Sequence, residues 1–176
     1  SNGYGKFTVD ATGKWTYVMN TAHDEFAAGV TYVDKLTVLT ADGTSQVITV
    51  NMVGTNDAAV IGGVSTAALV ETNAILTAAG ALTITDVDNT AAFVPQTAVA
   101  GSGGYGKFSI DATGKWTYAT NTAHDEFVQG VTYTDSVTVS AVDGTTKVIT
   151  VTMTGTNDAA VIGGVTTATL IESNVA

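Results

Sequence analysis

Hydrophobic and polar residues alternate with a period of two along several short segments of this chain. Residues 131–141 carry mostly Val, Tyr and Ala at odd positions and Thr or Ser at even positions, and residues 149–154 alternate between apolar residues and Thr. Such segments are typical of half-buried β-strands with a polar outer face. No segment has the sustained 3.6-residue apolar period of a helix. The pattern therefore predicts an all-β protein.

The strands and turns can be placed along about 100 residues. Asp111–Lys115 and Asp143–Thr145 contain the Asp and Gly residues of tight turns, and the second links the two longest strands as a hairpin. Seven short strands in this length predict an antiparallel β-sandwich of immunoglobulin-like architecture. Its core is expected to contain Phe108, Trp116, Tyr118 and Phe127. The strands are predicted near residues 60–70, 79–86, 93–99, 106–110, 115–119, 131–142 and 146–154.

The sequence repeats itself with an offset of 101 residues. Residues 1–75 and 102–176 are identical at 52 of 75 positions. A unit of this size is a whole domain, because solenoid units are only about 20–50 residues long. With Asn-Asp as the end of a unit, residues 1–57 are the C-terminal part of one repeat, 58–158 are a complete repeat and 159–176 are the N-terminal strand of the next. We therefore expect the natural protein to extend in both directions.

Composition narrows the possible functions. The net charge is −10, all six basic residues are Lys, there is no Cys and there are only two His. An acidic chain without Arg is a poor partner for nucleic acid or an anionic membrane surface. The apolar stretches are much shorter than the ~20 residues of a membrane span. Missing thiols exclude disulfides and thiolate metal sites, whereas the acidity suits cations.

Acidic and Asn residues gather at the predicted strand ends instead of scattering along the chain. Tracing the sandwich places them at its two poles, where consecutive units would meet. At the first junction, residues of the partial unit would meet residues of the complete one: Asp24, Glu25, Asn56, Asp57, Asp86, Asp88 and Asp143. The second junction would present another set to the following unit: Glu71, Asp125, Glu126, Asn157 and Asp158.

Carboxylates packed this closely require a counter-charge, and the chain has no Arg. Calcium (Ca2+) fits this chemistry, because it accepts about six to eight oxygen ligands in flexible geometry, whereas Mg2+ demands a tighter octahedron. The alternative is a set of solvated turn residues, since Asp-Gly and Asn-Asp are ordinary turn formers. We predict Ca2+ at the domain junctions.

A series of motifs in the complete unit resembles the VCBS repeat of very large bacterial surface proteins and RTX-type adhesins. The motifs cover the whole unit, and Gly-Thr-Asn-Asp as its last residues is the most specific of them. They are Asp86-x-Asp88, Gly106-Lys107-Phe108, Asp111-x-x-Gly114-x-Trp116-x-Tyr118, Asp135-x-Val137-x-Val139, Asp143-Gly144 and Gly155-Thr156-Asn157-Asp158.

More distantly, the acidic positions are similar to the calcium-binding positions of cadherin repeats, so the fold expected is a tandem series of cadherin-like sandwiches. The resemblance implies a non-catalytic, extracellular stalk on a bacterial cell surface, with Ca2+ stiffening the junctions. It also implies a role in adhesion and biofilm formation. The expected partners are neighbouring repeats of the same protein and calcium, with no nucleic acid and no membrane insertion.

Two other functional interpretations can be drawn from the sequence. His23 and His124 each precede Asp-Glu, which offers an acid–base pair. No Ser or Cys nucleophile stands beside them and there is no phosphate-binding loop, so we expect no enzymatic activity. Rows of Thr at 132, 134 and 138 and at 152, 154 and 156 could order water or bind glycans. Exposed Thr is also the ordinary choice on a strand.

The two incomplete repeats, residues 1–57 and 159–176, leave a further possibility open. Residues 1–57 lack the first strands of their own unit, and residues 159–176 supply a first strand. One chain could insert this strand into another by donor-strand complementation, which would make the molecule a subunit of a self-assembling surface filament. The alternative is that these residues are part of a longer chain, in which the neighbouring repeats are covalently attached.

Overall fold

The computed structural model describes residues 2–172, which form strands and no helix. Twelve strands lie in these residues, and their bounds are as follows: β1 (Gly5–Val9), β2 (Trp15–Met19), β3 (Thr31–Leu39), β4 (Ser45–Val53), β5 (Val60–Gly63), β6 (Thr66–Val70), β7 (Thr77–Thr85), β8 (Gln96–Ala100), β9 (Gly106–Ile110), β10 (Lys115–Thr120), β11 (Thr132–Ser140) and β12 (Thr146–Thr154). The all-β prediction is confirmed.

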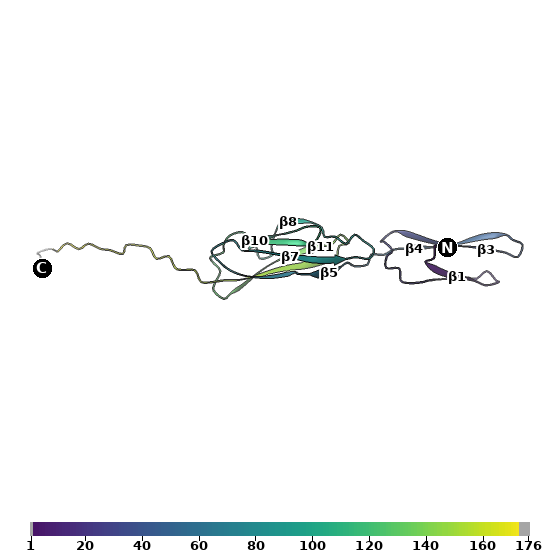
Figure 1. The fold of residues 1–176 in the computed structure, drawn as a ribbon, viewed down its shortest axis with the longest axis horizontal. Coiled ribbons are helices and arrows are strands. Elements are labelled where there is room, and N and C mark those ends of the chain that lie inside the picture. Colours follow the sequence, from purple (N-terminus) through teal and green to yellow (C-terminus); the bar gives the residue numbers. More distant parts are fainter. Residues whose placement is uncertain (1, 173–176) are drawn as a thin grey trace.

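Strands β5 to β12 build one complete β-sandwich from residues of the second repeat. One sheet has the order β5-β7-β10-β9-β8, and the other has the order β11-β12-β6. The four strands β1 to β4 form two separate two-stranded sheets from the end of the first repeat. Figure 1 shows that this N-terminal part, the complete sandwich and the C-terminal segment follow one another along the long axis.

The core of the complete sandwich contains the aromatic residues that the sequence predicted. Phe108, Trp116, Tyr118 and Phe127 are all buried, together with aliphatic residues of β11 and β12. The parity along β11 also matches the prediction, since Val137 and Val139 point inward between exposed or half-buried Thr and Ser.

One inward position of β11 holds a carboxylate. Asp135 is fully buried and accepts hydrogen bonds from the backbone N–H groups of Gly103 and Gly106, at 2.7 and 2.9 Å. The hydroxyl of Tyr118 donates to it as well, at 3.1 Å. Burial raises the pKa of Tyr118, and the charge of Asp135 adds to the effect. Asp135 thus ties the turn before β9 to the opposite sheet.

The predicted first strand, 60–70, is wrong as a single element. It divides into β5 and β6, which belong to different sheets. The division occurs at Gly63, whose φ is 85° and where a Cβ would lie only 2.5 Å from the carbonyl oxygen of Ala81. The complete repeat therefore has eight strands instead of seven. The strand predicted at 93–99 also begins later, at Gln96, because Phe93 forms only an isolated bridge to Ala141.

One strand pair differs from the expected antiparallel arrangement. β6 runs parallel to β12, with Thr66 opposite Thr150 and Val70 opposite Thr154. The other strand pairs of the complete sandwich are antiparallel. The crossover at Gly63 is the reason, because it carries the chain to the second sheet without reversing its direction.

Residues 159–172 form no strand in the described chain. Their apolar side chains are almost fully exposed, and Val161 has an exposed fraction of 98%. The predicted strand of a following unit includes residues 173–176, which lie outside the described residues.

Candidate cation sites

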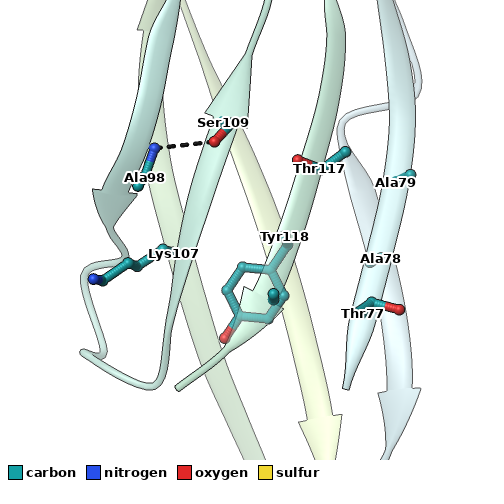
Figure 2. A pocket seen from close by; sticks show the side chains of 9 residues that line it. Thr77, Ala78, Ala79, Ala98, Lys107, Ser109, Thr117 and Tyr118 are labelled. Atoms are coloured by element: carbon teal, nitrogen blue, oxygen red, sulfur yellow. Dashed lines mark hydrogen bonds between the residues drawn. The ribbon is translucent and has the colours of Figure 1, made fainter. Parts of the chain in front are cut away.

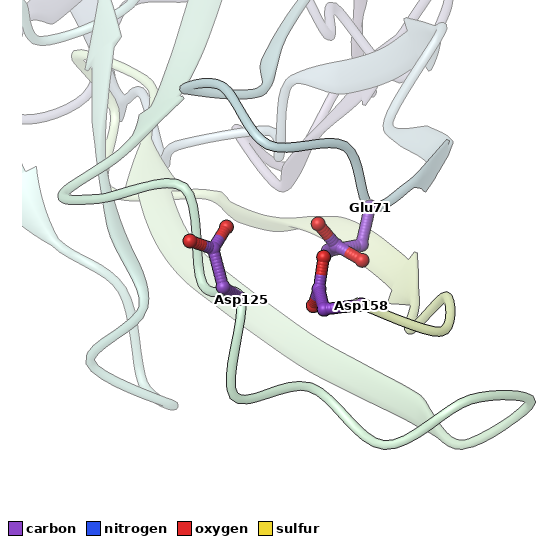
Figure 3. Close-up of side chains that lie close together, drawn as sticks. All are labelled: Glu71, Asp125 and Asp158. Carbon is purple, nitrogen blue, oxygen red and sulfur yellow. The ribbon is translucent and has the colours of Figure 1, made fainter. Parts of the chain in front are cut away.

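Three carboxylates meet at the C-terminal pole of the complete sandwich. Glu71 follows β6, Asp125 lies in the loop between β10 and β11, and Asp158 lies four residues after β12. One ligand oxygen of each lies within 4.8 Å of those of the other two. We call Glu71, Asp125 and Asp158 the distal cluster; Figure 3 shows their side chains facing one another. It joins residues that are 87 positions apart in the sequence.

The ladder between β6 and β12 positions Glu71. The backbone N–H of Glu71 donates to the carbonyl of Thr154 at 2.8 Å, and the backbone N–H of Thr156 donates to Glu71 Oε2 at 3.1 Å. The Thr156 hydroxyl donates to the same oxygen. These hydrogen bonds hold Glu71 in place. Its side chain is buried, with an exposed fraction of only 1%.

The distal cluster has more negative charge than its surroundings balance. Glu71 Oε1 and Asp158 Oδ2 are buried without a hydrogen-bond partner. Burial raises the pKa of Asp158, and the charges of Glu71 and Asp125 raise it further. In the described part of the chain, no Lys forms an ion pair with a member of the cluster. Buried carboxylate oxygens without donors are the ligands that a hard cation accepts.

A second acidic group surrounds the connection between the N-terminal part and the complete sandwich. Asp86 and Asp88 follow β7, and Asp143 lies in the turn between β11 and β12. We call Asp57, Asp86, Asp88 and Asp143 the linker cluster. The backbone N–H of Asp57 donates to Asp88 Oδ2 at 3.4 Å, and that of Ala59 donates to Asp143 Oδ2 at 2.8 Å.

The carboxylates of the linker cluster are in different electrostatic environments. Burial raises the pKa of Asp88, and the neighbouring carboxyl of Asp86 adds to the effect. In contrast, hydrogen bonds from the Thr145 hydroxyl and from Ala59 lower the pKa of Asp143 to about 2. Asp86 Oδ2 and Asp88 Oδ1 are buried without hydrogen-bond partners. This pole therefore also has unpaired acceptor oxygens.

Amide side chains join the two sides of this connection. The side chain of Asn89 donates to Asn56 Oδ1 at 2.6 Å. Asn89 was not among the predicted ligands, although its place directly after Asp86-Val87-Asp88 could have indicated it. Thr156 was missed as well, although it stands inside the Gly-Thr-Asn-Asp motif. Asn157, which corresponds to Asn56, is exposed and bonds the carbonyl of Asp158.

The structure places two of the predicted ligands elsewhere. Glu126 contacts His124 Nδ1 at 2.6 Å, and Glu25 makes the same contact with His23 at 2.7 Å. Both His Nε2 atoms lie within hydrogen-bond distance of a carbonyl, so the ring is fully satisfied only when both nitrogens carry protons. These contacts direct Glu25 and Glu126 towards His, and their role as metal ligands stays a prediction.

Asp24 is exposed and corresponds to Asp125, as Asp57 corresponds to Asp158. The position that corresponds to Glu71 would lie 101 residues earlier, outside the sequence. In the described residues, the distal cluster is the one group in which three such ligand atoms lie within 4.8 Å of one another. Asp24 and Asp57 therefore have only part of the set that the complete repeat has.

A hollow lies elsewhere, on the solvent side of the five-stranded sheet. It is lined mainly by small side chains of β7, β9 and β10, with Lys107 and Ala98 at one side, as Figure 2 shows. Ala98 has a φ of 53° beside a register shift in β8, and its N–H donates to the Ser109 hydroxyl at 3.0 Å. The bulge accounts for this local shape, and no carboxylate lines the hollow.

The predicted rows of Thr lie opposite one another on the paired strands β11 and β12. Thr132 is opposite Thr154 and Thr134 is opposite Thr152. The three predicted Thr of β11 are exposed and those of β12 are half-buried. A ligand role for these Thr residues stays a prediction.

Comparison with known proteins places the complete sandwich in a family. None of the curated proteins matches the sequence significantly. The described residues form no helix with the length and hydropathy that a membrane crossing requires. The family model of the bacterial cadherin-like domain matches residues 56–155, which begin one residue before Asp57 and end just after β12. The chain therefore belongs to the bacterial cadherin-like domain family.

Proposed function

We propose that this chain is a non-catalytic structural segment of a bacterial surface adhesin or fibre, in which Ca2+ at the domain junctions stiffens a stalk. Domains of this family are typically extracellular and structural. The VCBS-like motifs of the sequence extend the proposal to RTX-type adhesins, adhesion and biofilm formation. The stalk would project a binding domain away from the cell surface, with neighbouring repeats as its partners.

The distal cluster is the observation that carries the calcium proposal. Three carboxylates with one ligand oxygen each within 4.8 Å of the others repel one another, and two of them have buried oxygens that lack donors. A bound cation would remove this repulsion and satisfy the orphaned oxygens. Glu71, Asp125 and Asp158 would hold it, and flexible all-oxygen coordination favours Ca2+ over Mg2+.

The linker cluster supports the mechanical part of the proposal. Its carboxylates come from three separate segments, namely the linker at Asp57, the loop at Asp86 and Asp88, and the turn at Asp143. A cation shared among them would fix the linker to the sandwich and restrict bending between domains. Without calcium, the same carboxylates would repel one another and the connection would become flexible.

Thermal unfolding and small-angle X-ray scattering test this function. We expect Ca2+ to raise the unfolding midpoint and lengthen the particle relative to chelator, and Mg2+ to have little effect. Asp57→Ala and Asp86→Ala should lose the change in particle length while the sandwich stays folded. Asp111→Ala is the charge-matched control, because Asp111 lies in a turn outside both clusters. Unchanged midpoint and length in Ca2+ would contradict the proposal.

A further inference from the structure

The complete sandwich has four strands at the edges of its two sheets. They are β5 and β8 in the larger sheet and β11 and β6 in the smaller one. The backbone groups on the outer side of an edge strand form a template on which another chain can pair. Proteins normally shield such edges with a very short strand, a Pro, a charged side chain, a bulge or a covering segment.

Three of these edges are shielded. β5 has only four residues, and two of them are Gly. β8 directly follows Pro95 and contains a register shift in its pairing with β9. The segment before β9 covers β11, because the backbone N–H groups of Val94 and Ser102 donate to the carbonyls of Ser140 and Ser136. These three edges are poor templates for another strand.

β6 is the exception. Its five residues, Thr66–Val70, include no charged residue and no Pro, and its pairing with β12 has no register shift. Among the described residues, β6 pairs with β12 alone. The corresponding segment of the following repeat, Thr167–Ile171, is also free of charge and of Pro. The open edge of β6 therefore belongs to the repeat itself.

The hydrogen bonds to β12 show which backbone groups of β6 are free. The carbonyl of Ser65 accepts from the N–H of Thr150 at 2.9 Å, and the N–H of Glu71 donates to the carbonyl of Thr154 at 2.8 Å. Alternate residues of a strand bond to the same neighbour, so the odd-numbered residues face β12. The even-numbered residues direct their N–H and C=O groups to the open side: Thr66, Ala68 and Val70.

We propose that β6 of one copy of this chain pairs with β6 of a second copy as an antiparallel strand, about a two-fold axis at Ala68. This register places Thr66 opposite Val70 and Ala68 opposite itself. In an antiparallel ladder, pairs that exchange both hydrogen bonds alternate with pairs that exchange none. Thr66, Ala68 and Val70 are then the bonded residues, so each free N–H and C=O of the strand has a partner. A shift by one residue would oppose them to residues already bonded to β12.

The contact is isologous, because both copies use the same strand. It joins two three-stranded sheets into one sheet with the order β11-β12-β6-β6-β12-β11. A single contact of five residues is small, but it would recur in each repeat of two tandem arrays that lie side by side, and such contacts reinforce one another. The partner is a second copy of this chain, bound laterally. This pairing goes beyond the proposed stalk and does not require calcium.

Disulfide cross-linking in chelator tests the register. The chain has no Cys, so Ala68→Cys introduces a single thiol on an exposed side chain. Opposite residues of a bonded pair have Cα atoms about 5.5 Å apart, which lies within the range of about 4.4–6.8 Å that a disulfide spans. Mild oxidation should convert this variant to a covalent dimer. Thr138→Cys is the matched control, because Thr138 is exposed on β11, and it should stay largely monomeric.

Sedimentation equilibrium in chelator provides a second measurement. The mass of the wild type should rise above the monomer value of 17.8 kDa as the concentration increases. Ala68→Lys should lose this association, because two like charges would lie directly opposite each other at the axis. Thr138→Lys adds the same charge away from β6 and should associate as the wild type does. Thermal unfolding of both variants verifies that the sandwich stays folded.

Three results would overturn the proposal. One is a wild type that stays monomeric while Ala68→Cys and Thr138→Cys cross-link equally. Another is association that Ala68→Lys leaves unchanged, because a different surface would then join the copies. The third is equal loss of association in Ala68→Lys and Thr138→Lys. Because chelator is present throughout, none of these results bears on calcium binding or on the stalk function.

Discussion

Trp15 and Trp116 occupy the same position in two copies of one motif, yet Trp15 is 44% exposed and Trp116 is 1% exposed. Trp116 is covered by β7, where a Cβ at Gly80 would lie 2.6 Å from its ring, and it donates to the carbonyl of Val64. The residues that correspond to Gly80 and Val64 would lie 101 positions earlier, before the first residue of the sequence. The burial of Trp116 therefore depends on segments that precede it by 36 to 52 positions.

Fluorescence quenching should separate the two tryptophans. In dilute protein, Trp116→Phe leaves Trp15 as the emitter, and we expect red-shifted emission that iodide quenches readily. Trp15→Phe leaves Trp116, whose emission should be blue-shifted and protected. Equal quenching of the two variants would contradict the difference in exposure between Trp15 and Trp116.

The same contrast predicts unequal effects of two core truncations. Ile149→Ala should destabilise the complete sandwich by about 2–5 kcal/mol, because Ile149 is fully buried and its truncation leaves a cavity. Ile48→Ala removes the equivalent, half-buried side chain and should leave unfolding of the complete sandwich unchanged. Denaturant unfolding of both variants measures the difference. Similar losses would mean that the two parts unfold as one cooperative unit.

Asp135 should be intolerant of an isosteric change. Asp135→Asn replaces one acceptor oxygen by an NH2 group that faces N–H or O–H donors, so we expect a loss of about 3 kcal/mol. Ser136→Ala is the neighbouring control, and its cost should be within about 0.5 kcal/mol because its hydroxyl bonds only the exposed Ser102 hydroxyl. Chemical denaturation measures the free energy of unfolding of both variants. Equal stability would contradict a stabilising role for the buried hydrogen bonds of Asp135.

The turn between β9 and β10 should have a measurable signature in the titration of Asp111. Hydrogen bonds from the side chain and backbone of Thr113 lower the pKa of Asp111, despite partial desolvation. Thr113→Val removes the hydroxyl and should move this pKa back towards its ordinary value, as measured by NMR titration. Because the folded pKa is depressed, the stabilisation exists above the unfolded pKa and is lost as pH falls through the folded one. An unchanged pKa in the variant would exclude the hydroxyl as its cause.

The alternation of residues predicted much of the sandwich because side chains in a strand point to opposite faces. Val137 and Val139 were placed inward on this basis, and they are buried. The break between β5 and β6 was missed, although Gly62-Gly63 lies in the middle of the run and Gly within a strand often marks such a bend. The parallel pairing of β6 with β12 follows from that break. The two-residue alternation of apolar and polar residues alone could not predict it.

The sequence could predict which candidate ligands lie at the same pole of the sandwich, because each strand end can be assigned to one pole. Glu71 and Asp158 were placed at one pole, and their oxygens lie within 4.8 Å of each other. Side-chain direction was not predictable in this way. Glu126 lies two residues after His124, which has a φ of 62° and whose ring contacts the Glu126 side chain. A left-handed conformation at His has no clear pattern in the sequence.

Site-specific NMR titration with Ca2+ tests the central claim most directly. The backbone amide of Thr156 donates to Glu71, so it reports on the distal cluster alone. We predict that Ca2+ shifts this resonance in the wild type and in Glu126→Gln, whereas Mg2+ at the same concentration does not shift it and Glu71→Gln abolishes the response. An amide of Thr156 that does not respond to Ca2+, or one that responds equally in Glu71→Gln, would contradict calcium binding by Glu71, Asp125 and Asp158.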